Sequence, residues 1–536
     1  MSVSAVEPAE HPAGRRGAAT SRGRPPSRPR VELLVASVVA ISAALIASVG
    51  SWSVSLWSDE VATISASSRS LHDLGRLVQH IDAVHGTYYA LVHEWTAWFG
   101  AAPAVLRFPS AVAVGIAAAG VYVLVARIAD AHTALLAAGI FSVLPRVTWA
   151  GIEARSFALT IATAIWLTVF LHVAVSGRSR RPLFAYAAIL AVAVMLNLYL
   201  VFIPAAHAVT LLLRPRTRRA FLPFAMSAAV GVLLAGPVVI AGLKQGGQLG
   251  QRERGALDLA RNVIVNQWFL GETPTGTTSS GASLVGAAQA SSVWKFAAVG
   301  AALVCWALVA HALHAAWRRP DPATRELVAW TVPWLLLPTL LVEAYAVVSP
   351  SAYNARYFSF SAPALAILIA IGLRRFAPRL TAGVAALVVL LILPVYASQR
   401  TMTAKSGSDW AMAAAWLDGR TRPGDGVYFA PRDGATGGPI LRSLRTVRIG
   451  YPAPFDGLLD VSLVASPAAG ATLFGTSASL PDVLGRLDGL DRLWVLRRQD
   501  RMTDSRADDQ LLSAAGFDVV EVWDGPQTQV VEMARG

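Results

Sequence analysis

The chain has 536 residues, of which 54% are hydrophobic and 15% are charged, and its mean hydropathy is +0.50. Soluble domains carry about 25% charged residues, so this composition excludes an ordinary soluble protein and predicts a membrane protein. A net charge of +13 would favour nucleic acid as the partner of a soluble chain. In a membrane protein, arginines that mark cytoplasmic loops explain the same charge, and no nucleic-acid partner is expected.

The first 30 residues are rich in Pro, Gly, Ser and Arg, which predicts a disordered tail. Six arginines stand in this tail, just before the first apolar run at 31–52. A cleaved signal peptide is the alternative, but its apolar core would span only about 7–15 residues. We therefore expect an anchored helix with the N-terminus in the cytoplasm.

Eleven apolar segments approach the length of about 20 residues that a helix needs to cross a bilayer. With the N-terminus inside, every cytoplasmic loop contains arginine, as the positive-inside rule predicts. Asn197 and Pro204 shorten two neighbouring segments, for which one bent hairpin is the alternative. The segments lie near residues 31–52, 104–126, 133–149, 156–175, 183–197, 199–213, 220–242, 292–317, 326–348, 357–373 and 379–398.

The main loops on the outer side hold most of the loop acids, histidines and aromatic residues. These loops are 53–103, 150–155, 243–291 and 349–356. The Gly-, Ser- and Thr-rich residues 275–292 predict a mobile outer loop.

An odd number of crossings also places residues 399–536 on the outer side. Short strands are expected at 426–430, 446–451, 493–496 and 519–522, with helices at 408–418, 481–490 and 507–515. This pattern predicts a small α/β domain. It has neither a G-x-G-x-x-G after a strand nor a P-loop, so no nucleotide fingerprint is present.

Two adjacent acids, Asp59 and Glu60, follow the first span directly. Carboxylates at a membrane surface are costly to desolvate, and they usually mark function. The alternative is structural: Asp59 caps a helix through residues 61–65, and Glu60 interacts with the helix dipole.

The same outer loop continues with Asp82, His85, Tyr88 and Tyr89 before an amphipathic stretch. Hydroxyls and imidazoles hydrogen-bond sugars, and aromatic faces stack on them. An interfacial aromatic belt is the alternative for the tyrosines. A metal held by Asp59, Glu60 and His85 is a further alternative, although tight ligand spacing is missing.

Two later outer loops each place one arginine at the membrane surface. Arg155 follows Glu153 in a very short loop, and Arg356 stands beside Tyr357. Arginine grips phosphate through paired donors, so both are candidate phosphate ligands. The alternatives are a weak surface pair between Glu153 and Arg155, and an Arg356 that snorkels beside an aromatic belt.

Together these segments resemble the protein-mannosyltransferase-like family of lipid-dependent glycosyltransferases, which have the GT-C fold. Residues 57–60 (WSDE) resemble the acidic pair after the family's first helix, and residues 82–89 (DAVHGTYY) resemble its Asp-x-His-Pro-Pro-Leu-Tyr-Tyr segment. Residues 106–110 (LRFPS) and 153–159 (EARSFAL) resemble its Leu-Arg-Leu-Pro-Ser and Glu-Ala-Arg-x-Tyr-Ala-Leu. Residues 356–358 (RYF) resemble its late Arg-Tyr, and the five segments stand in family order.

The sequence departs from that pattern in the second segment. One extra residue separates Asp82 from His85, and Gly86-Thr87 stands where the family has Pro-Pro-Leu. The resemblance covers about residues 31–400, and the actinobacterial members are the relatives expected.

The resemblance implies an all-α polytopic membrane enzyme of the GT-C type with a small extracytoplasmic α/β domain. It also implies a polyprenyl-phosphate sugar donor, an inverting transfer, and an extracytoplasmic glycan, lipid or protein acceptor. Its implied parts are a cytoplasmic tail (1–30), a transmembrane domain (31–398) whose outer loop 53–103 is catalytic, and the outer domain (399–536).

The implied site roles begin with Asp59 as general base. Arg155 and Arg356 would hold the departing phosphate, where negative charge develops. Glu60 or Glu153 would orient the acceptor or a divalent metal, the one cofactor left open. The remaining candidate substrate contacts are Asp82, whose role is open, His85, Tyr88, Tyr89 and Tyr357.

Two other functions fit parts of the sequence. A lipid transporter or flippase would bind amphiphiles too, but such proteins bury ionisable groups in mid-helix and show inverted repeats, which are not evident here. A scaffold with a working outer domain would not need eleven helices. The 43 arginines against three lysines are typical of a GC-rich bacterial genome. By analogy, mannose or arabinose on a decaprenyl carrier is the expected donor.

Overall fold

The computed structural model describes residues 29–177, 179–246, 255–271, 293–318, 321–346, 353–430, 443–499 and 502–536. The tail expected to be disordered, up to residue 28, and the predicted mobile loop 275–292 lie outside these residues.

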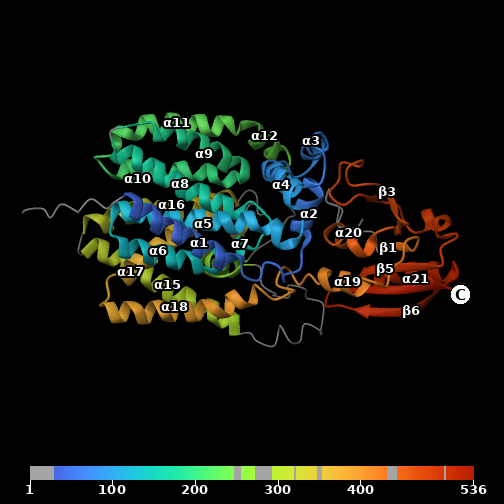
Figure 1. Cartoon of the computed structure of the whole chain (residues 1–536). Coiled ribbons are helices and arrows are strands. Elements are labelled where there is room, and N and C mark those ends of the chain that lie inside the picture. The colour runs from blue at the N-terminus through green and yellow to red at the C-terminus, as the bar shows by residue number, and fades with distance from the viewer. Residues whose placement is uncertain are drawn as a thin grey trace, which may run out of the picture.

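The described chain forms a bundle of apolar helices with a small sheet region at one end (Figure 1). Within the described residues, seven helices are long and apolar enough to cross a membrane, and the number is nine if two bent helix pairs are single spans. Two shorter apolar helices, α9 and α10, occupy the region that Asn197 divides. Every predicted span therefore coincides with apolar helix, while the count of eleven crossings stays a prediction.

The helices of the bundle are α1 (Pro29–Ser48), α5 (Pro103–Ile128), α6 (Ala131–Val143), α7 (Pro145–Gly151), α8 (Phe157–Ser176), α9 (Pro182–Leu196), α10 (Ile203–Leu213), α11 (Phe221–Leu234), α12 (Gly236–Lys244), α15 (Val293–Arg318), α16 (Pro322–Ala346), α17 (Ala362–Leu373) and α18 (Pro378–Ser398). The 3-10 turns η2 (Leu198–Phe202) and η3 (Arg218–Ala220) precede α10 and α11.

Prolines explain both bent pairs. The chain turns by 64° between α6 and α7, where Pro145 is the first residue of the second helix. It turns by 56° between α11 and α12, where Pro237 is the second residue of the second helix. Proline cannot donate the backbone hydrogen bond that would continue the first helix. The first bend matters most for the site, because α7 leads into the short loop that carries Glu153 and Arg155.

The loops that are predicted to lie outside, called outer loops below, contain shorter helices. The first loop has α2 (Ser58–Ser67), α3 (Leu71–His80), η1 (Ala83–His85) and α4 (Gly86–Phe99). The third has α13 (Ala256–Arg261), the π-helical η5 (Asn262–Asn266) and α14 (Gln267–Phe269), and η6 (Ala355–Ser361) precedes α17.

The C-terminal α/β region, residues 399–536, is built on a five-stranded sheet of order β2-β1-β5-β7-β6. Strand β1 pairs in parallel with β2 and β5. Strand β7 pairs antiparallel with its two neighbours, β5 and β6. The strands are β1 (Gly426–Ala430), β2 (Leu459–Asp460), β5 (Arg492–Arg498), β6 (Phe517–Asp524) and β7 (Thr528–Arg535), and β3 (Leu463–Ala465) and β4 (Thr476–Ser477) form a separate pair.

Helical segments cover both faces of this sheet. The alternation along β1 places Val427 and Phe429 in a core shared with α19 (Trp410–Leu417), α20 (Arg445–Gly450) and η7 (Ala453–Phe455). It places Tyr428 and Ala430 in a core shared with η8 (Pro481–Leu487) and α21 (Met502–Ala514).

Most of the elements predicted for this region are confirmed: strands at 426–430, 493–496 and 519–522, and helices near 408–418, 481–490 and 507–515. The strand predicted at 446–451 is wrong, because these residues form α20. Thr446, Val447 and Ile449 favour a strand locally. However, α20 lies between the core of the sheet and α2. As a helix, it packs Val447 into the core of the sheet and Ile449 against the cluster that contains α2.

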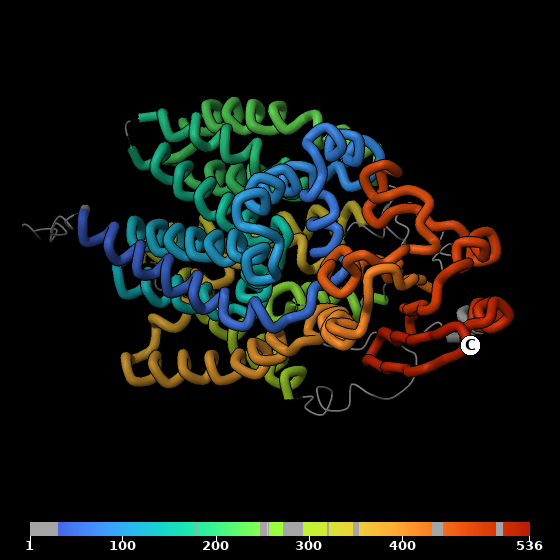
Figure 2. The backbone as a smooth tube through the Cα atoms, turned by 45° about the vertical axis from the view of Figure 1, so that its right-hand side comes forward, coloured from blue at the N-terminus to red at the C-terminus, as the bar shows by residue number. Residues whose placement is uncertain are grey.

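The C-terminal region packs against the first outer loop. Figure 2 shows its orange and red tube beside the blue tube of that loop. Tyr451 accepts a hydrogen bond from the backbone N–H of Leu56 at 2.8 Å, and α20 contacts α2. Ser65 and Arg69 donate to the backbone carbonyls of Leu473 and Thr472.

Candidate active site

The first predicted site residues lie in the first turn of α2. Its N-cap is Trp57, whose backbone is extended (φ −129°, ψ 177°) and whose side chain caps nothing. The alternative in which Asp59 caps the helix is therefore wrong. Both Asp59 and Glu60 stand in the first turn, where the helix dipole favours negative charge.

Asp59 meets both predicted arginines. Arg356 Nη1 lies 3.0 Å from Asp59 Oδ2, and Arg155 Nη2 lies 3.7 Å from Asp59 Oδ1. The Asp59 side chain is 23% exposed, against 16% for Arg356 and 7% for Arg155. Three separate outer loops thus bring one carboxylate and two guanidinium groups together, and the carboxylate remains accessible.

A chain of hydrogen bonds continues behind Arg155. Its Nη1 donates to the hydroxyl of Tyr89 at 2.9 Å, and that hydroxyl donates to Asp82 Oδ2 at 2.8 Å. Asp82 adopts a left-handed backbone conformation (φ 57°), which Asp tolerates better than most residues, at the junction of α3 and η1. Asp82 therefore holds Tyr89, which in turn holds Arg155.

His85 lies close to Tyr89. Its ring centroid is 5.9 Å from that of Tyr89. Its Nδ1 is buried without a hydrogen-bond partner among the described residues. Burial, together with the charge of Arg155, lowers the pKa of His85 to about 4. The imidazole is therefore neutral at neutral pH.

Aromatic rings surround the guanidinium group of Arg356. The ring centroids of Trp57, Tyr357 and Phe157 lie 5.2, 5.8 and 5.9 Å from its Cζ. Tyr357 thus lies directly beside the Arg356 guanidinium group. Since Arg356 also pairs with Asp59, it is not merely a cation that snorkels to water.

Glu60 points away from Asp59 into the protein and is fully buried. Arg107 donates to Glu60 Oε1 and Oε2 at 2.7 and 2.6 Å, and Lys405 donates to Oε1 at 2.6 Å. The backbone N–H of Ala154 also donates to Oε1 at 3.0 Å. The expectation that Glu60 acts catalytically beside Asp59 is therefore corrected: both carboxylate oxygens are occupied by fixed donors.

Glu153 is also fully buried, so the alternative of a surface pair with Arg155 is wrong. Its Oε2 lies 2.8 Å from Lys405 Nζ, and its Oε1 accepts a hydrogen bond of 2.7 Å from Trp57 Nε1. Glu153 therefore has no exposed oxygen with which to contact an acceptor directly.

The pKa values of the two buried glutamates are shifted in opposite directions. Burial raises the pKa of Glu60, but the attraction of Arg107 and Lys405 outweighs it and brings the pKa down to about 2. Burial raises the pKa of Glu153 to about 7; Lys405 opposes this rise, and the charge of Glu60 adds to it. Glu60 is thus the fixed anion of the cluster.

Tyr88 is buried in the same cluster as Tyr89, with Leu106 and Leu196, and its contact with the substrate stays a prediction. The metal site is not supported by the geometry. Glu60 is engaged elsewhere, so it does not join Asp59 and His85 as a ligand set. Within the described residues, no group of three or more His, Cys, Asp or Glu side chains is placed to hold a metal ion.

Sequence reasoning assigned no role to three residues of this cluster: Trp57, Arg107 and Lys405. Arg107 carried a signal, because an arginine inside an apolar helix needs a partner. Lys405 carried none beyond its rarity, since its partners are 345 and 252 residues away in the chain.

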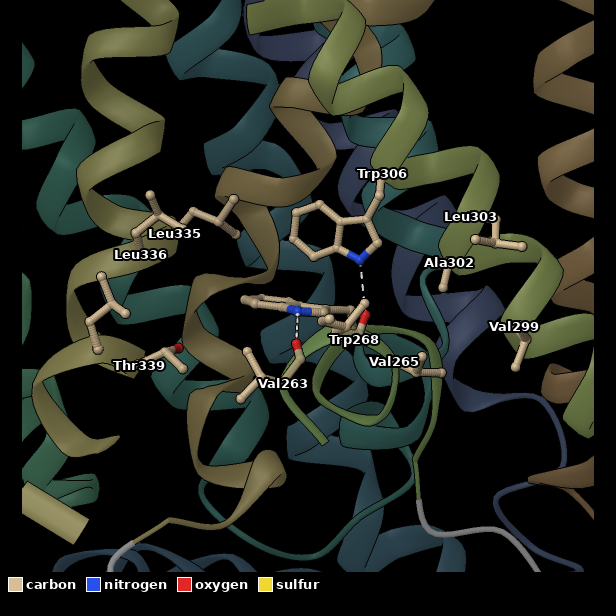
Figure 3. A pocket seen from close by; sticks show the side chains of 12 residues that line it. Val263, Val265, Trp268, Val299, Ala302, Leu303, Trp306, Leu335, Leu336 and Thr339 are labelled. Atoms are coloured by element: carbon tan, nitrogen blue, oxygen red, sulfur yellow. Dashed lines mark hydrogen bonds between the residues drawn. The ribbon is translucent and has the colours of Figure 1, made fainter. Parts of the chain in front are cut away.

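An apolar cavity of about 470 Å³ opens between α15, α16 and η5 (Figure 3). Two indoles shape it: Trp268 Nε1 donates to Val263 O at 2.7 Å, and Trp306 Nε1 donates to Ile264 O at 2.9 Å. Its lining consists of Val263, Ile264, Val265, Trp268, Val299, Ala302, Leu303, Trp306, Leu335, Leu336, Thr339 and Leu340.

Side-chain contacts connect this cavity with Arg356. Gln267, next to Trp268, donates to Thr339 at 3.0 Å and accepts a hydrogen bond of 2.9 Å from Tyr353. The Tyr353 ring stacks on Phe358 at 5.3 Å, two residues beyond Arg356. These contacts run from Thr339 in the cavity lining to Phe358, close to Arg356 in the chain, whereas Asp59, Arg155 and Arg356 do not line the cavity.

Comparison with protein families gives one match. Residues 88–240 match the model of the dolichyl-phosphate-mannose-protein mannosyltransferase family. The matched segment includes Arg107 and Arg155, whereas Asp59 and Arg356 lie outside it. No curated protein matches the chain.

Several solved structures have a similar fold. ArnT from Cupriavidus metallidurans, bound to undecaprenyl phosphate, superposes over 94% of this chain and 97% of its own, with a TM-score of 0.55 and 13% identity. The oligosaccharyltransferase AglB from Archaeoglobus fulgidus, in complex with an inhibitory peptide and a dolichol-phosphate, gives 0.49 and 13% over 93% of this chain and 74% of its own. The arabinofuranosyltransferase AftD from Mycobacteria gives a TM-score of 0.47 and 18% identity, over 95% of this chain and 40% of its own. The superposition on ArnT extends through the helix bundle and the C-terminal sheet region alike.

Proposed function

We propose that this chain, whose fold is similar to that of ArnT, is a multi-pass membrane glycosyltransferase that moves a sugar from a polyprenyl-phosphate donor to a hydroxyl acceptor on the extracytoplasmic side. The observation that carries the proposal is the meeting of Asp59 with Arg155 and Arg356. Transfer of a sugar from a lipid phosphate needs cations for the phosphate and a base for the acceptor hydroxyl. The apolar cavity between α15 and α16 offers a place for the lipid.

In the proposed reaction, the acceptor oxygen attacks the anomeric carbon while the bond from that carbon to the phosphate oxygen breaks. Asp59 takes the acceptor proton, and the configuration inverts. Arg155 and Arg356 stabilise the charge on the departing polyprenyl phosphate. His85, as a neutral imidazole, and Tyr89 contact the sugar or its phosphate, and Asp82 keeps Tyr89 in place.

The ion pairs of Asp59 suggest an order of events. The Asp59 carboxylate pairs with the same two arginines that the phosphate needs. A donor phosphate that engages Arg155 and Arg356 releases Asp59 toward the acceptor. The donor is therefore proposed to bind first.

The proposed orientation has the N-terminus in the cytoplasm and residues 399–536 outside. It divides the chain into the tail (1–30), the transmembrane domain (31–398) and the outer domain (399–536). Mannose and arabinose on a decaprenyl carrier are the proposed donors, and an envelope glycan, lipid or protein is the acceptor.

The test offers the purified protein radiolabelled decaprenyl-phosphate mannose and decaprenyl-phosphate arabinose, with a crude envelope glycan as acceptor. Replacing Asp59 by Asn keeps the shape and removes the base, so transfer should fall by about 10²–10⁴-fold. The matched control is Asp456→Asn, the same change at an exposed position of the C-terminal region. Its activity should equal that of the wild type.

The outcomes separate the assignments. Transfer that persists in a folded Asp59→Asn protein excludes Asp59 as the base. A wild type that transfers neither sugar, and none from a wider donor panel, removes the proposed reaction and favours a lipid transporter.

A further inference from the structure

From the C-terminal region we infer that Lys405 is the positioning residue of this site: it fixes Asp59, Arg155 and Arg356 through their chain neighbours. This inference rests on the proposed function. Lys405 is 1% exposed, and it lies just after the last helix of the bundle.

The first link runs to Asp59 and Arg155. Lys405 Nζ donates to Glu60 Oε1 at 2.6 Å and to the backbone carbonyl of Ile152 at 2.5 Å. Glu60 follows Asp59, and the same Oε1 accepts from Ala154, which precedes Arg155. One ammonium group therefore fixes α2 relative to the short loop 152–155.

The second link runs to Arg356. Lys405 Nζ lies 2.8 Å from Glu153 Oε2, and Glu153 Oε1 accepts from Trp57 Nε1. The indole of Trp57 is the ring nearest to the Arg356 guanidinium group, at 5.2 Å. The position of the Trp57 ring thus depends on the buried pair of Glu153 and Lys405.

The chain around Lys405 is itself held rigidly. Ser406 and Gly407 have positive φ values of 53° and 74°, which form a tight turn directly after it. Ser408 donates to the carbonyl of Leu56 at 2.6 Å. Asp409 accepts from the backbone N–H groups of Gln527 and Thr528 at 2.7 and 2.8 Å. The C-terminal sheet and the start of α2 therefore fix Lys405 together.

Arg107 neutralises Glu60, so Lys405 is not needed for that charge alone. Its distinct contribution is to hold Glu60, Glu153 and the Ile152 carbonyl around one atom. A shift of about 1 Å between reacting groups costs roughly 10²-fold in rate. Loss of Lys405 should therefore reduce turnover more than folding.

The experiment compares Lys405→Met, Lys405→Arg and the double variant Lys405→Met/Glu153→Gln, each as the full chain. The double variant removes both partners of the contact between Lys405 and Glu153, so neither is left buried without the other. The control is Arg445→Met, which breaks another buried ion pair, with Asp460 at 2.6 Å, inside the C-terminal region. Three quantities are measured: turnover with the donor that the wild type uses, the affinity for decaprenyl phosphate, and the melting temperature.

Lys405→Met should lose roughly 100-fold in turnover, and its affinity for decaprenyl phosphate should also fall. Lys405→Arg should recover part of the turnover, because it keeps a cation with several donors. The double variant should regain the melting temperature without the turnover. Arg445→Met should lose melting temperature but keep turnover per folded molecule.

A double variant that regains wild-type turnover would show that charge balance alone matters and would overturn the inference. The inference would also be overturned if Lys405→Met had the turnover of the wild type and the same affinity for decaprenyl phosphate. If the wild type itself transfers no sugar, the proposed function fails. The affinity for decaprenyl phosphate then decides the inference about Lys405, because a value unchanged by Lys405→Met contradicts it.

Discussion

At the scale of single residues, chemically similar side chains have different positions and different tasks. Asp59 and Glu60 are adjacent, yet Asp59 is accessible between two arginines while Glu60 is enclosed by Arg107 and Lys405. Successive residues of a helix point about 100° apart, so an acidic pair in one turn faces two environments. Of these two acids, only Asp59 has a partly exposed carboxylate.

The depressed pKa of His85 leads to a prediction about stability. Its folded pKa of about 4 is below the ordinary value of 6.5 because burial disfavours the charged imidazole. The unfolded chain therefore binds a proton between these values that the folded protein does not, and stability falls as the pH drops from about 6.5 to 4. The melting temperature of His85→Gln should decline less over this range than that of the wild type.

The matched control for this pH series is His80→Gln, at an exposed position of α3. It should follow the wild-type curve. A His85→Gln protein with the wild-type dependence on pH would mean that His85 protonates normally in the folded state.

At the scale of elements, broken helices deliver the site residues. The bend at Pro145 turns the chain, and α7 then ends at Gly151, directly before the loop with Glu153 and Arg155. Irregular backbone at this depth is tolerated where protein buries it, and residues 152–156 are buried. The break thus places polar residues inside the outer half of the fold.

Close helix packing depends on small residues, which gives a second prediction. A Cβ at Gly115 in α5 would lie 2.5 Å from the backbone oxygen of Ala40 in α1. Gly115→Ala should therefore force the two helices apart and cost about 1–3 kcal/mol. The loss is measured as a lower melting temperature in detergent.

Gly139 in α6 provides the comparison, because a Cβ there meets nothing within 4 Å. Gly139→Ala should be neutral or slightly stabilising, since Ala favours helix over Gly. Equal melting temperatures for the two variants would mean that α1 and α5 are not packed as closely as described.

At the scale of the whole molecule, the C-terminal region belongs to the site rather than hanging from the bundle. It supplies Lys405 to the buried cluster and Tyr451 to the start of α2, and its chain covers Ser65 and Arg69. We therefore expect the membrane helices alone to be an incomplete enzyme.

The proposed orientation is a third prediction, and single cysteines test it. The native Cys305 is buried and is first replaced by Ala. Ala469→Cys, exposed in the C-terminal region, should react with an impermeant thiol reagent in right-side-out vesicles. Ala131→Cys, at the start of α6, should react only in inside-out vesicles, and the reverse pattern would contradict the orientation.

The sequence by itself determined the membrane class, the positions of the apolar helices and the main site candidates. Bilayer thickness acts on each segment separately, so length and apolarity can be read locally. Asp59, Arg155 and Arg356 could be identified because each stands in a short motif at an outer loop. Most strands and helices of the C-terminal region could also be predicted from local patterns.

Only the tertiary structure decided which charges face each other. The burial of Glu60 and Glu153 and their shared contact with Lys405 arise from segments far apart in the chain. The same holds for α20, whose strand-like residues become helical between the sheet core and α2. Local sequence sets the preference of each segment, but a buried charge is stable only with a partner, and packing chooses that partner.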